Sequence, residues 1–175
     1  MSIILDGTNG ITSVNGAASL CVAGPAFQAY LGSNQTITNA STTVIQCNTK
    51  EFDTAGAYNN TSSTATLNGL SVPAWSFMPP VAGYYQVSIG MQLSTGTGFQ
   101  RAYQWIYKTG SLYKRVQDTS ASAPVSMEGS VLVYLNGSTD YITAYGYVST
   151  TTGTVGFNGG SIDLTYFSAS MVRSA

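Results

Sequence analysis

Few residues in this chain could do chemistry, and the carboxylates are the first to consider. There are seven of them, and only Glu51 and Asp53 lie close together in the sequence. On an extended strand their side chains would point to the same side. A glycosidase needs two carboxyl groups flanking one bond, so this pair is the best candidate for such catalysis. We expect it instead to solubilise the edge of a sheet.

Nucleophilic catalysis has less support. The chain has no histidine, which removes the commonest general base and the commonest metal ligand, and a serine nucleophile would have only lysine as its base. Cys21 and Cys47 show no metal-binding or catalytic spacing, so we expect two free thiols, with one disulfide as the alternative. We predict no enzyme, no cofactor and no metal site. Calcium is an alternative that nothing in the spacing requires.

The composition narrows the choice of partners. Charged residues make up 7% of the chain and the net charge is −1, whereas 22 Ser and 22 Thr supply most of the polarity. A nearly neutral surface attracts neither nucleic acid nor an anionic membrane. The opening "MSIILDGTNG" does not look like a signal peptide, and no apolar run approaches the ~18 residues of a membrane helix. We therefore expect synthesis in a cytoplasm, no membrane insertion and no nucleic acid partner.

The elements that position these residues are strands, because apolar residues recur with a period of two. Between Tyr84 and Leu93 one face carries Tyr85, Val87, Ile89, Met91 and Leu93, which predicts a half-buried antiparallel strand. Residues 101–108 place Tyr103, Trp105 and Tyr107 on one face. The Asn-Gly pair at 136–137 predicts a hairpin joining 130–135 to 140–148.

Regular turn clusters at 94–98, 118–124 and 149–154 separate these strands, which predicts an all-β antiparallel sandwich or jelly roll. The segment 1–24 differs, since it is rich in Gly and Asn and has too little apolar surface to fold alone. We predict a jelly-roll head at 25–175. The preceding segment would be a trimerising or attachment element with short strands, and an unstructured lead-in is the alternative.

The stretch "FMPPVAGYYQVSIGMQL" (77–93) combines a stiff corner with the clearest strand. Pro79 and Pro80 cannot donate hydrogen bonds to a sheet, so pairing must stop there, and Gly83 would let the chain turn. The next strand then starts in a fixed register. A slip of one residue would turn its apolar face to solvent.

This stretch resembles the central signature of complement-one-q and tumour-necrosis-factor-like jelly rolls. Other pieces match in order: "AFQAYL" (26–31), "EFDTAGAYNN" (51–60), "SVLVYLNGSTDYITAY" (130–145) with Asp140 at an acidic position, and "YFSASMV" (166–172). The resemblance covers roughly residues 25–173. Two departures are Ala169, where the family often has Gly, and the absence of a collagen repeat before the domain. The lead-in "DGTNGIT" is similar to repeats in bacteriophage tail fibres.

The resemblance implies a homotrimer about a threefold axis. Aromatic residues then become candidates for the core or the subunit interface: Tyr85, Tyr103, Trp105, Tyr107, Tyr141, Tyr145, Tyr147 and Phe167. The alternative for rings exposed at a tip is stacking on sugars. Small uncharged loop residues are the candidates for contact with a receptor, and they suit a neutral glycan: Thr95, Thr97, Phe99, Thr119, Ser120, Ser122, Thr150, Thr151 and Thr152.

Together these features predict a non-enzymatic virion structural protein, a phage tail fibre or tail tip, that binds a glycan or protein on the host-cell surface and attaches to other virion proteins. A structural decoration or trimerising clamp without receptor binding is the first alternative. A cellular lectin-like head and a depolymerase-like enzyme are the others.

Overall fold

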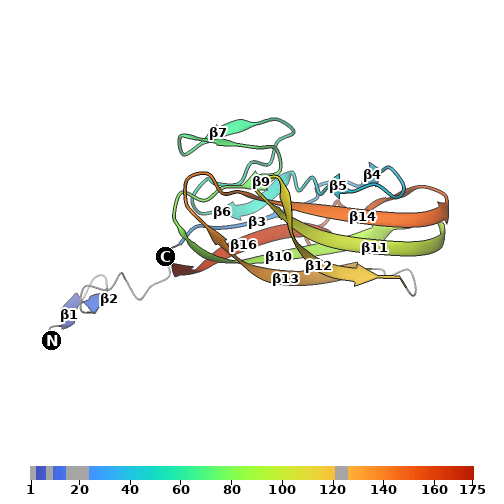
Figure 1. Ribbon diagram of the computed structural model, residues 1–175. Helices are drawn as coiled ribbons and strands as arrows, with labels where there is room; N and C mark the ends of the chain where they lie inside the picture. The colour runs from blue at the N-terminus through green and yellow to red at the C-terminus, as the bar shows by residue number, and fades with distance from the viewer. Residues whose placement is uncertain (1–2, 7–9, 15–23, 121–125) are drawn as a thin grey trace.

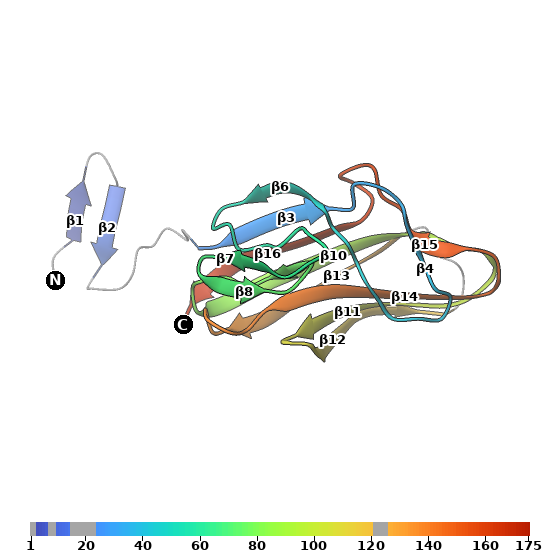
Figure 2. The same ribbon diagram turned by 90° about the horizontal axis from the view of Figure 1, so that it is seen from above.

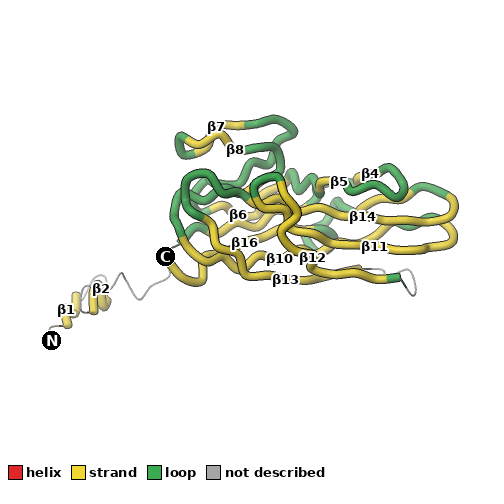
Figure 3. Tube along the Cα trace, viewed as in Figure 1, coloured by secondary structure: helices red, strands yellow, loops and turns green. Residues whose placement is uncertain are grey.

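The computed structural model of the protein describes residues 3–6, 10–14, 24–120 and 126–175. In these ranges it contains strands and loops and no helix, so no helix could span a membrane there (Figure 3). The all-β class and the antiparallel pairing predicted from the period-two alternation are confirmed.

Two sheets form the layers of the head (Figure 1). The first sheet contains β6 (Thr49–Asp53), β3 (Ala26–Tyr30), β16 (Tyr166–Ser174), β10 (Gly83–Ser94), β13 (Ser126–Leu135), β15 (Val155–Phe157) and β4 (Gln35–Ile37). The second sheet contains β12 (Ser111–Thr119), β11 (Thr97–Lys108), β14 (Ile142–Thr152), β5 (Thr43–Val44) and β9 (Ser76–Phe77).

Two small hairpins lie outside these sheets. β1 (Ile3–Asp6) pairs with β2 (Gly10–Val14), and β7 (Ala65–Leu67) pairs with β8 (Leu70–Val72). The opening segment therefore has the short strands predicted for it, while Cys21 lies outside the described residues. The division of the chain at residue 24 stays a prediction.

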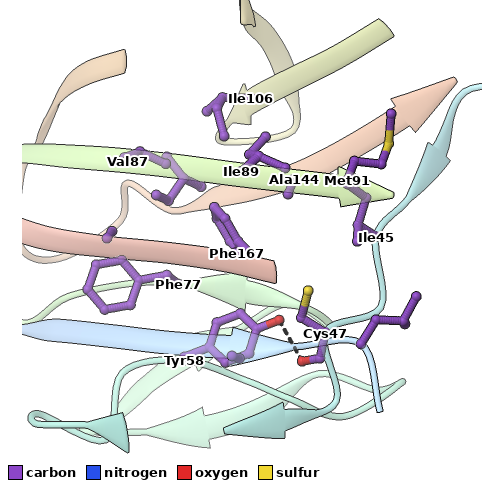
Figure 4. Close-up of a cluster of buried hydrophobic side chains, with 14 of the residues drawn as sticks. Ile45, Cys47, Tyr58, Phe77, Val87, Ile89, Met91, Ile106, Ala144 and Phe167 are labelled. Atoms are coloured by element: carbon purple, nitrogen blue, oxygen red, sulfur yellow. Dashed lines mark hydrogen bonds between the residues drawn. The ribbon is translucent and has the colours of Figure 1, made fainter. Parts of the chain in front are cut away.

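The core lies between the sheets, and β10 supplies its centre because the predicted alternation holds. Tyr85, Val87, Ile89 and Met91 are fully buried, and Leu93 nearly so. Phe27 of β3 stacks on Tyr58 with ring centroids 4.4 Å apart, and its ring lies edge-on to Phe167 at 5.0 Å. Figure 4 shows part of the core, with Tyr58, Phe77 and Phe167 among its labelled side chains; the hydroxyl of Tyr58 donates to the carbonyl of Cys47 at 2.9 Å.

The proline corner stops the pairing as predicted, since β9 ends at Phe77 and β10 begins at Gly83. The role predicted for Gly83 was wrong. It is the first residue of β10, without a positive φ, and a Cβ there would lie 2.5 Å from the carbonyl oxygen of Arg173. Glycine is needed at this point because β16 approaches closely, and not because the chain turns there.

The predicted hairpin at Asn136–Gly137 was also wrong. The tight turn does form, since the side-chain oxygen of Asn136 accepts from the amides of Ser138, Thr139 and Asp140 and Gly137 has φ 74°. However, β13 pairs with β10 in the first sheet, and β14 pairs with β11 in the second. The turn therefore carries the chain from one layer to the other.

The two ends of the head differ. The amide of Met171 donates to the carbonyl of Pro25, and that of Ala175 to the carbonyl of Ala82, so the start of the head, its C-terminus and the proline corner lie together. The opposite end carries β4 and β15 (Figures 1 and 2). We call this opposite end the distal end.

Candidate functional site

Glu51 and Asp53, the carboxylates closest together in the sequence, have different environments and different roles. The carboxylate of Asp53, with a side chain only 5% exposed, accepts from the amides of Ala57 and Tyr58 at 2.9 and 3.0 Å and from Lys50 at 2.9 Å. Glu51 is exposed and accepts from Gln28 at 2.9 Å. Asp53 therefore fixes the turn after β6.

Cys47 is fully buried, and desolvation raises the pKa of its thiol far above the ordinary value. Because the thiolate is the reactive form, this cysteine acts as a small apolar side chain of the core.

Six of the nine exposed large apolar side chains of the described residues form what we call the apolar belt. It comprises Tyr84, Leu112, Tyr113, Leu132, Tyr134 and Val172. The cross-strand pair Tyr84 and Tyr134 lies on the outer face of the first sheet, with ring centroids 5.5 Å apart. Leu132 and Val172 are 49% and 48% exposed and, together with Tyr84 and the C-terminal residues, line a groove of about 560 Å³. Six large side chains on a few strands exceed the scattered single ones that a soluble surface normally carries.

The apolar belt continues around the edge of the sandwich onto β12. Leu112 and Tyr113 are 54% and 45% exposed, and the hydroxyl of Tyr113 reaches the carbonyl of Leu132 at 3.4 Å. Lys108 donates to the carbonyl of Tyr134 at 2.8 Å and places its ammonium over that ring, 5.6 Å from the centroid. Face and edge therefore form one continuous surface made from β16, β10, β13 and β12.

The predicted aromatic candidates divide into two groups. Tyr85 and Phe167 are fully buried core residues. The stripe predicted on residues 101–108 does form, and Tyr103, Trp105 and Tyr107 point away from the core side occupied by Ala102, Gln104 and Ile106. The following side chains make up what we call the outer ladder, on the outward face of the second sheet: Arg101, Tyr103, Trp105, Tyr107, Arg115, Tyr145 and Tyr147. Tyr141 lies just before β14 and is half-buried.

Rings and guanidiniums stack on each other along the outer ladder. Tyr103 and Trp105 are nearly parallel, with centroids 4.9 Å apart, and Tyr147 lies 5.0 Å from Tyr103. The guanidiniums of Arg101 and Arg115 lie 4.8 and 4.4 Å from the Tyr103 centroid. The two guanidiniums therefore cover the ring of Tyr103 by cation–π stacking.

One carboxylate, that of Asp118, accepts hydrogen bonds from both arginines of the outer ladder. Asp118 accepts from Arg101 at 3.1 and 2.9 Å and from Arg115 at 3.0 Å. The hydrogen bond from Arg101 is the main reason that the pKa of Asp118 lies below its usual value. The same bond raises the pKa of Arg101.

Most of the predicted loop residues gather near the distal end, although several belong to strands. Thr97 pairs with Thr152, and Phe99 with Thr150, where β11 meets β14. Thr95 lies in the turn between β10 and β11, and the hydroxyl of Thr151 donates to the carbonyl of Thr97 at 3.0 Å.

The other predicted loop residues lie at the end of β12 or are buried. Thr119 pairs with Ala102 and Ser120 follows it, whereas Ser122 lies outside the described residues. Thr150 is buried by Asn39, which bonds its amide and its carbonyl.

Sequence reasoning missed the apolar belt, because the alternation assigned Tyr84 to a polar face. A signal was present in "VLVYL" (131–135), where every residue is apolar. A strand that is apolar on both faces is typical of one covered on both sides, yet Leu132 and Tyr134 are exposed in the single chain.

Comparison with known proteins places the fold. No protein-family model and no curated protein matches the chain. Among solved structures it resembles the globular domain of zebrafish complement 1qA (TM-score 0.54, 12% identity, 86% of this chain and 99% of that one). It also resembles murine APRIL (0.54, 11%, 85% and 99%) and Eiger TNF from S. frugiperda (0.54, 9%, 87% and 93%). At such identities the likeness concerns the fold. The head therefore has the antiparallel jelly-roll fold of complement 1q and tumour necrosis factor-like domains.

Proposed function

We propose that the protein is a non-enzymatic homotrimeric head of a phage virion structural protein, a tail fibre or tail tip, which binds a receptor on the host-cell surface. The observation that carries the assembly part is the apolar belt. Its six large side chains are 40–54% exposed in the single chain, and burying them in a subunit contact would stabilise it by roughly 25 cal/mol for each Å² of apolar surface.

A closed ring of subunits suits the shape of this belt. Its face part, on β10, β13 and β16, differs from its edge part on β12, so the two can pack against each other in neighbouring copies. Such a heterologous contact closes into a ring when the rotation allows it. The jelly-roll fold supports three as the number of subunits, because jelly rolls of the resembled family associate about a threefold axis.

The virion assignment rests on the similarity of "DGTNGIT" to repeats of phage tail fibres and on the nearly neutral composition. In this account residues 1–24 attach the head to other virion proteins or help to trimerise it, and β1–β2 is the element that they contribute. The start of the head and its C-terminus lie at one end and the apolar belt is taken up by the subunit contact, which leaves the distal end and the outward face of the second sheet for a receptor. Displaying three copies would multiply a weak interaction through effective concentration.

The proposal is tested on the purified full-length chain in two steps. Light scattering should give a mass of three chains, and fluorescently labelled protein should bind cells of the host strain. A trimer that binds no cells would favour the alternative of a structural decoration without receptor binding. A monomer at micromolar concentration would contradict the assembly part.

A further inference from the structure

The few charges of this protein are distributed unevenly. The hairpin formed by β11 and β12 carries four of the six basic residues and one of the seven acidic residues, so its net charge is +3. The rest of the chain carries −4. Asp140, from outside the hairpin, pairs with Lys108 at 2.9 Å, so the hairpin together with this carboxylate carries +2. An anionic ligand would be attracted there and not to the rest of the chain, which is negative.

Two of the four cations stand together on the outer ladder. Arg101 and Arg115 both contact Asp118, and the side chains of both remain 47% exposed. One carboxylate neutralises one of the two charges, so the cluster keeps a net charge of +1. Three guanidinium N–H groups reach Asp118, and each guanidinium has five, so donors remain for a further acceptor.

The contacts of Asp118 also indicate which kind of anion the two guanidiniums can bind. Its two oxygens accept from Nε and Nη2 of Arg101, the parallel two-bond geometry that a planar carboxylate makes with a guanidinium. A second carboxylate can meet the remaining donors of Arg115 in the same way.

The aromatic part of the ladder adds hydrogen-bonding groups at ring edges. Four of its rings are half-buried tyrosines, each with a phenolic hydroxyl: Tyr103, Tyr107, Tyr145 and Tyr147. The indole N–H of Trp105, a residue only 8% exposed, has no hydrogen-bond partner among the described residues. The guanidinium of Arg115 lies 6.0 Å from the Trp105 ring. If Arg115 turned toward a ligand, the environment of Trp105 would change with it.

This arrangement favours one class of polyanion. Nucleic acid binding to single strands relies on open aromatic faces for base stacking, whereas Tyr103 is covered by Trp105 and two guanidiniums. Ring edges with hydroxyl and N–H groups suit a ligand rich in hydroxyls. From Arg101 to Tyr107 the ladder covers six residue steps of β11, about 20 Å at ~3.3 Å per residue, which is long enough for several sugar units.

We propose that the outer ladder binds a carboxylated polysaccharide, with Arg101 and Arg115 on its carboxylates and the tyrosine hydroxyls on its hydroxyl groups. The inference rests on the proposed receptor-binding function and names the chemical class of the receptor. The receptor-binding site proposed here is the outward face of β11, β12 and β14. It differs from the site predicted from the sequence, which consisted of uncharged distal residues that suit a neutral glycan. That face lies on the second sheet, away from the part of the apolar belt on the first sheet.

The test measures the binding of polygalacturonate to the full-length chain by calorimetry, with neutral dextran and a dT oligonucleotide as comparison probes. Arg115→Gln and Lys114→Gln are a matched pair, because these neighbours on one strand carry the same charge and alternate in side-chain direction. We expect Arg115→Gln to weaken polygalacturonate binding at least tenfold, and Lys114→Gln by less than twofold. Tyr147→Phe, which removes only a hydroxyl, should weaken it about threefold.

Fluorescence gives a second readout. In a Trp75→Phe variant Trp105 is the remaining tryptophan of the chain, and its fluorescence should change on saturation with polygalacturonate. Equal losses for Arg115→Gln and Lys114→Gln would overturn the inference, as would equal binding of dextran or tighter binding of the oligonucleotide. Solution mass and cell binding are measured on the same samples. If the trimer binds cells but not polygalacturonate, the inference fails while the proposed function stands.

Discussion

Tyr84 and Tyr134 are cross-strand neighbours on β10 and β13, with ring centroids 5.5 Å apart, and both are about 40% exposed. Their strand neighbours Tyr85 and Val133 are buried on the opposite side of the same sheet. At this point the first sheet is therefore apolar on both faces, and within the described part of the chain only the inner face is covered by another layer.

The first prediction concerns this uncovered face. Leu132→Ser should release monomers, because it removes apolar surface from the centre of the proposed contact. Ile162→Ser is the matched control, since Ile162 is 55% exposed and lies outside the apolar belt. Sedimentation velocity at several concentrations measures the effect, with circular dichroism to confirm folding. If both variants dissociate equally, or neither does, the apolar belt is not the contact.

The second prediction concerns the turn that carries the chain between the sheets. Gly137 has φ 74°, and a Cβ there would lie 2.5 Å from the amide nitrogen of Ala82. Gly69 has φ 75°, but a Cβ at that position would meet no atom within 4 Å. Gly69→Ala should cost about 1 kcal/mol of unfolding free energy through backbone strain alone, and Gly137→Ala roughly 2–4 kcal/mol. Urea denaturation measures both, and equal costs would show that the approach of Ala82 does not constrain the turn.

The third prediction concerns the buried hydroxyl of Tyr58. It donates to the carbonyl of Cys47 at 2.9 Å, in a site without exposure to water. Tyr58→Phe keeps the ring stacked on Phe27 but leaves that carbonyl unsatisfied, which should cost about 1–3 kcal/mol. Tyr85→Phe is the comparison. The hydroxyl of Tyr85 donates to the carbonyl of Val81 at a partly buried position, where water can replace the lost donor. A smaller loss for Tyr58→Phe than for Tyr85→Phe would contradict this account.

The fourth prediction is a dependence of stability on pH. Hydrogen bonds from Arg101, more than any other cause, lower the pKa of Asp118 in the folded chain. A lowered folded pKa means that the contribution of Asp118 is present above its unfolded value of 3.8 and is lost as the pH falls through the folded value. The melting temperature of Asp118→Asn should thus lie below that of the unmodified chain at pH 6, and the difference should shrink below about pH 4. A difference that stays constant to pH 2 would exclude this linkage.

The fifth prediction concerns alkaline pH. Desolvation raises the pKa of Tyr58 and Tyr85 in the folded chain well above the ordinary value of 10.0. A raised folded pKa means that stability is complete below the unfolded pKa and falls as the pH rises above it. The melting temperature should therefore decrease from about pH 10 upward. In Tyr85→Phe the decrease should be shallower, and an equally steep decrease would argue against a contribution from Tyr85.

Much of the fold could be predicted because local patterns determine it. The alternation from Tyr85 to Leu93 gave the buried face of β10, and Pro79 with Pro80 gave the break before it. The hairpin predicted at Asn136–Gly137 failed because the same turn geometry serves a crossing between layers. Strand partners are decided by contacts distant in the sequence, such as Tyr85 with Val133 and Met171.

The candidate surfaces were harder to predict. The stripe of Tyr103, Trp105 and Tyr107 follows from alternation, but its position on an outward face does not, because alternation cannot tell inside from outside when both faces carry large side chains. Arg115 and Asp118 join that stripe from β12, whose pairing is shifted by two irregularities. The apolar belt draws on β10, β12, β13 and β16, so no single segment of the sequence displays it.

The central claim, assembly through the apolar belt, is tested most directly by the solution mass of the full-length chain and of Leu132→Ser, measured by light scattering at the same micromolar concentration. The account predicts a mass of three chains for the unmodified protein and one folded chain for the variant. A monomeric unmodified chain, or a trimer that the substitution leaves intact, would contradict it.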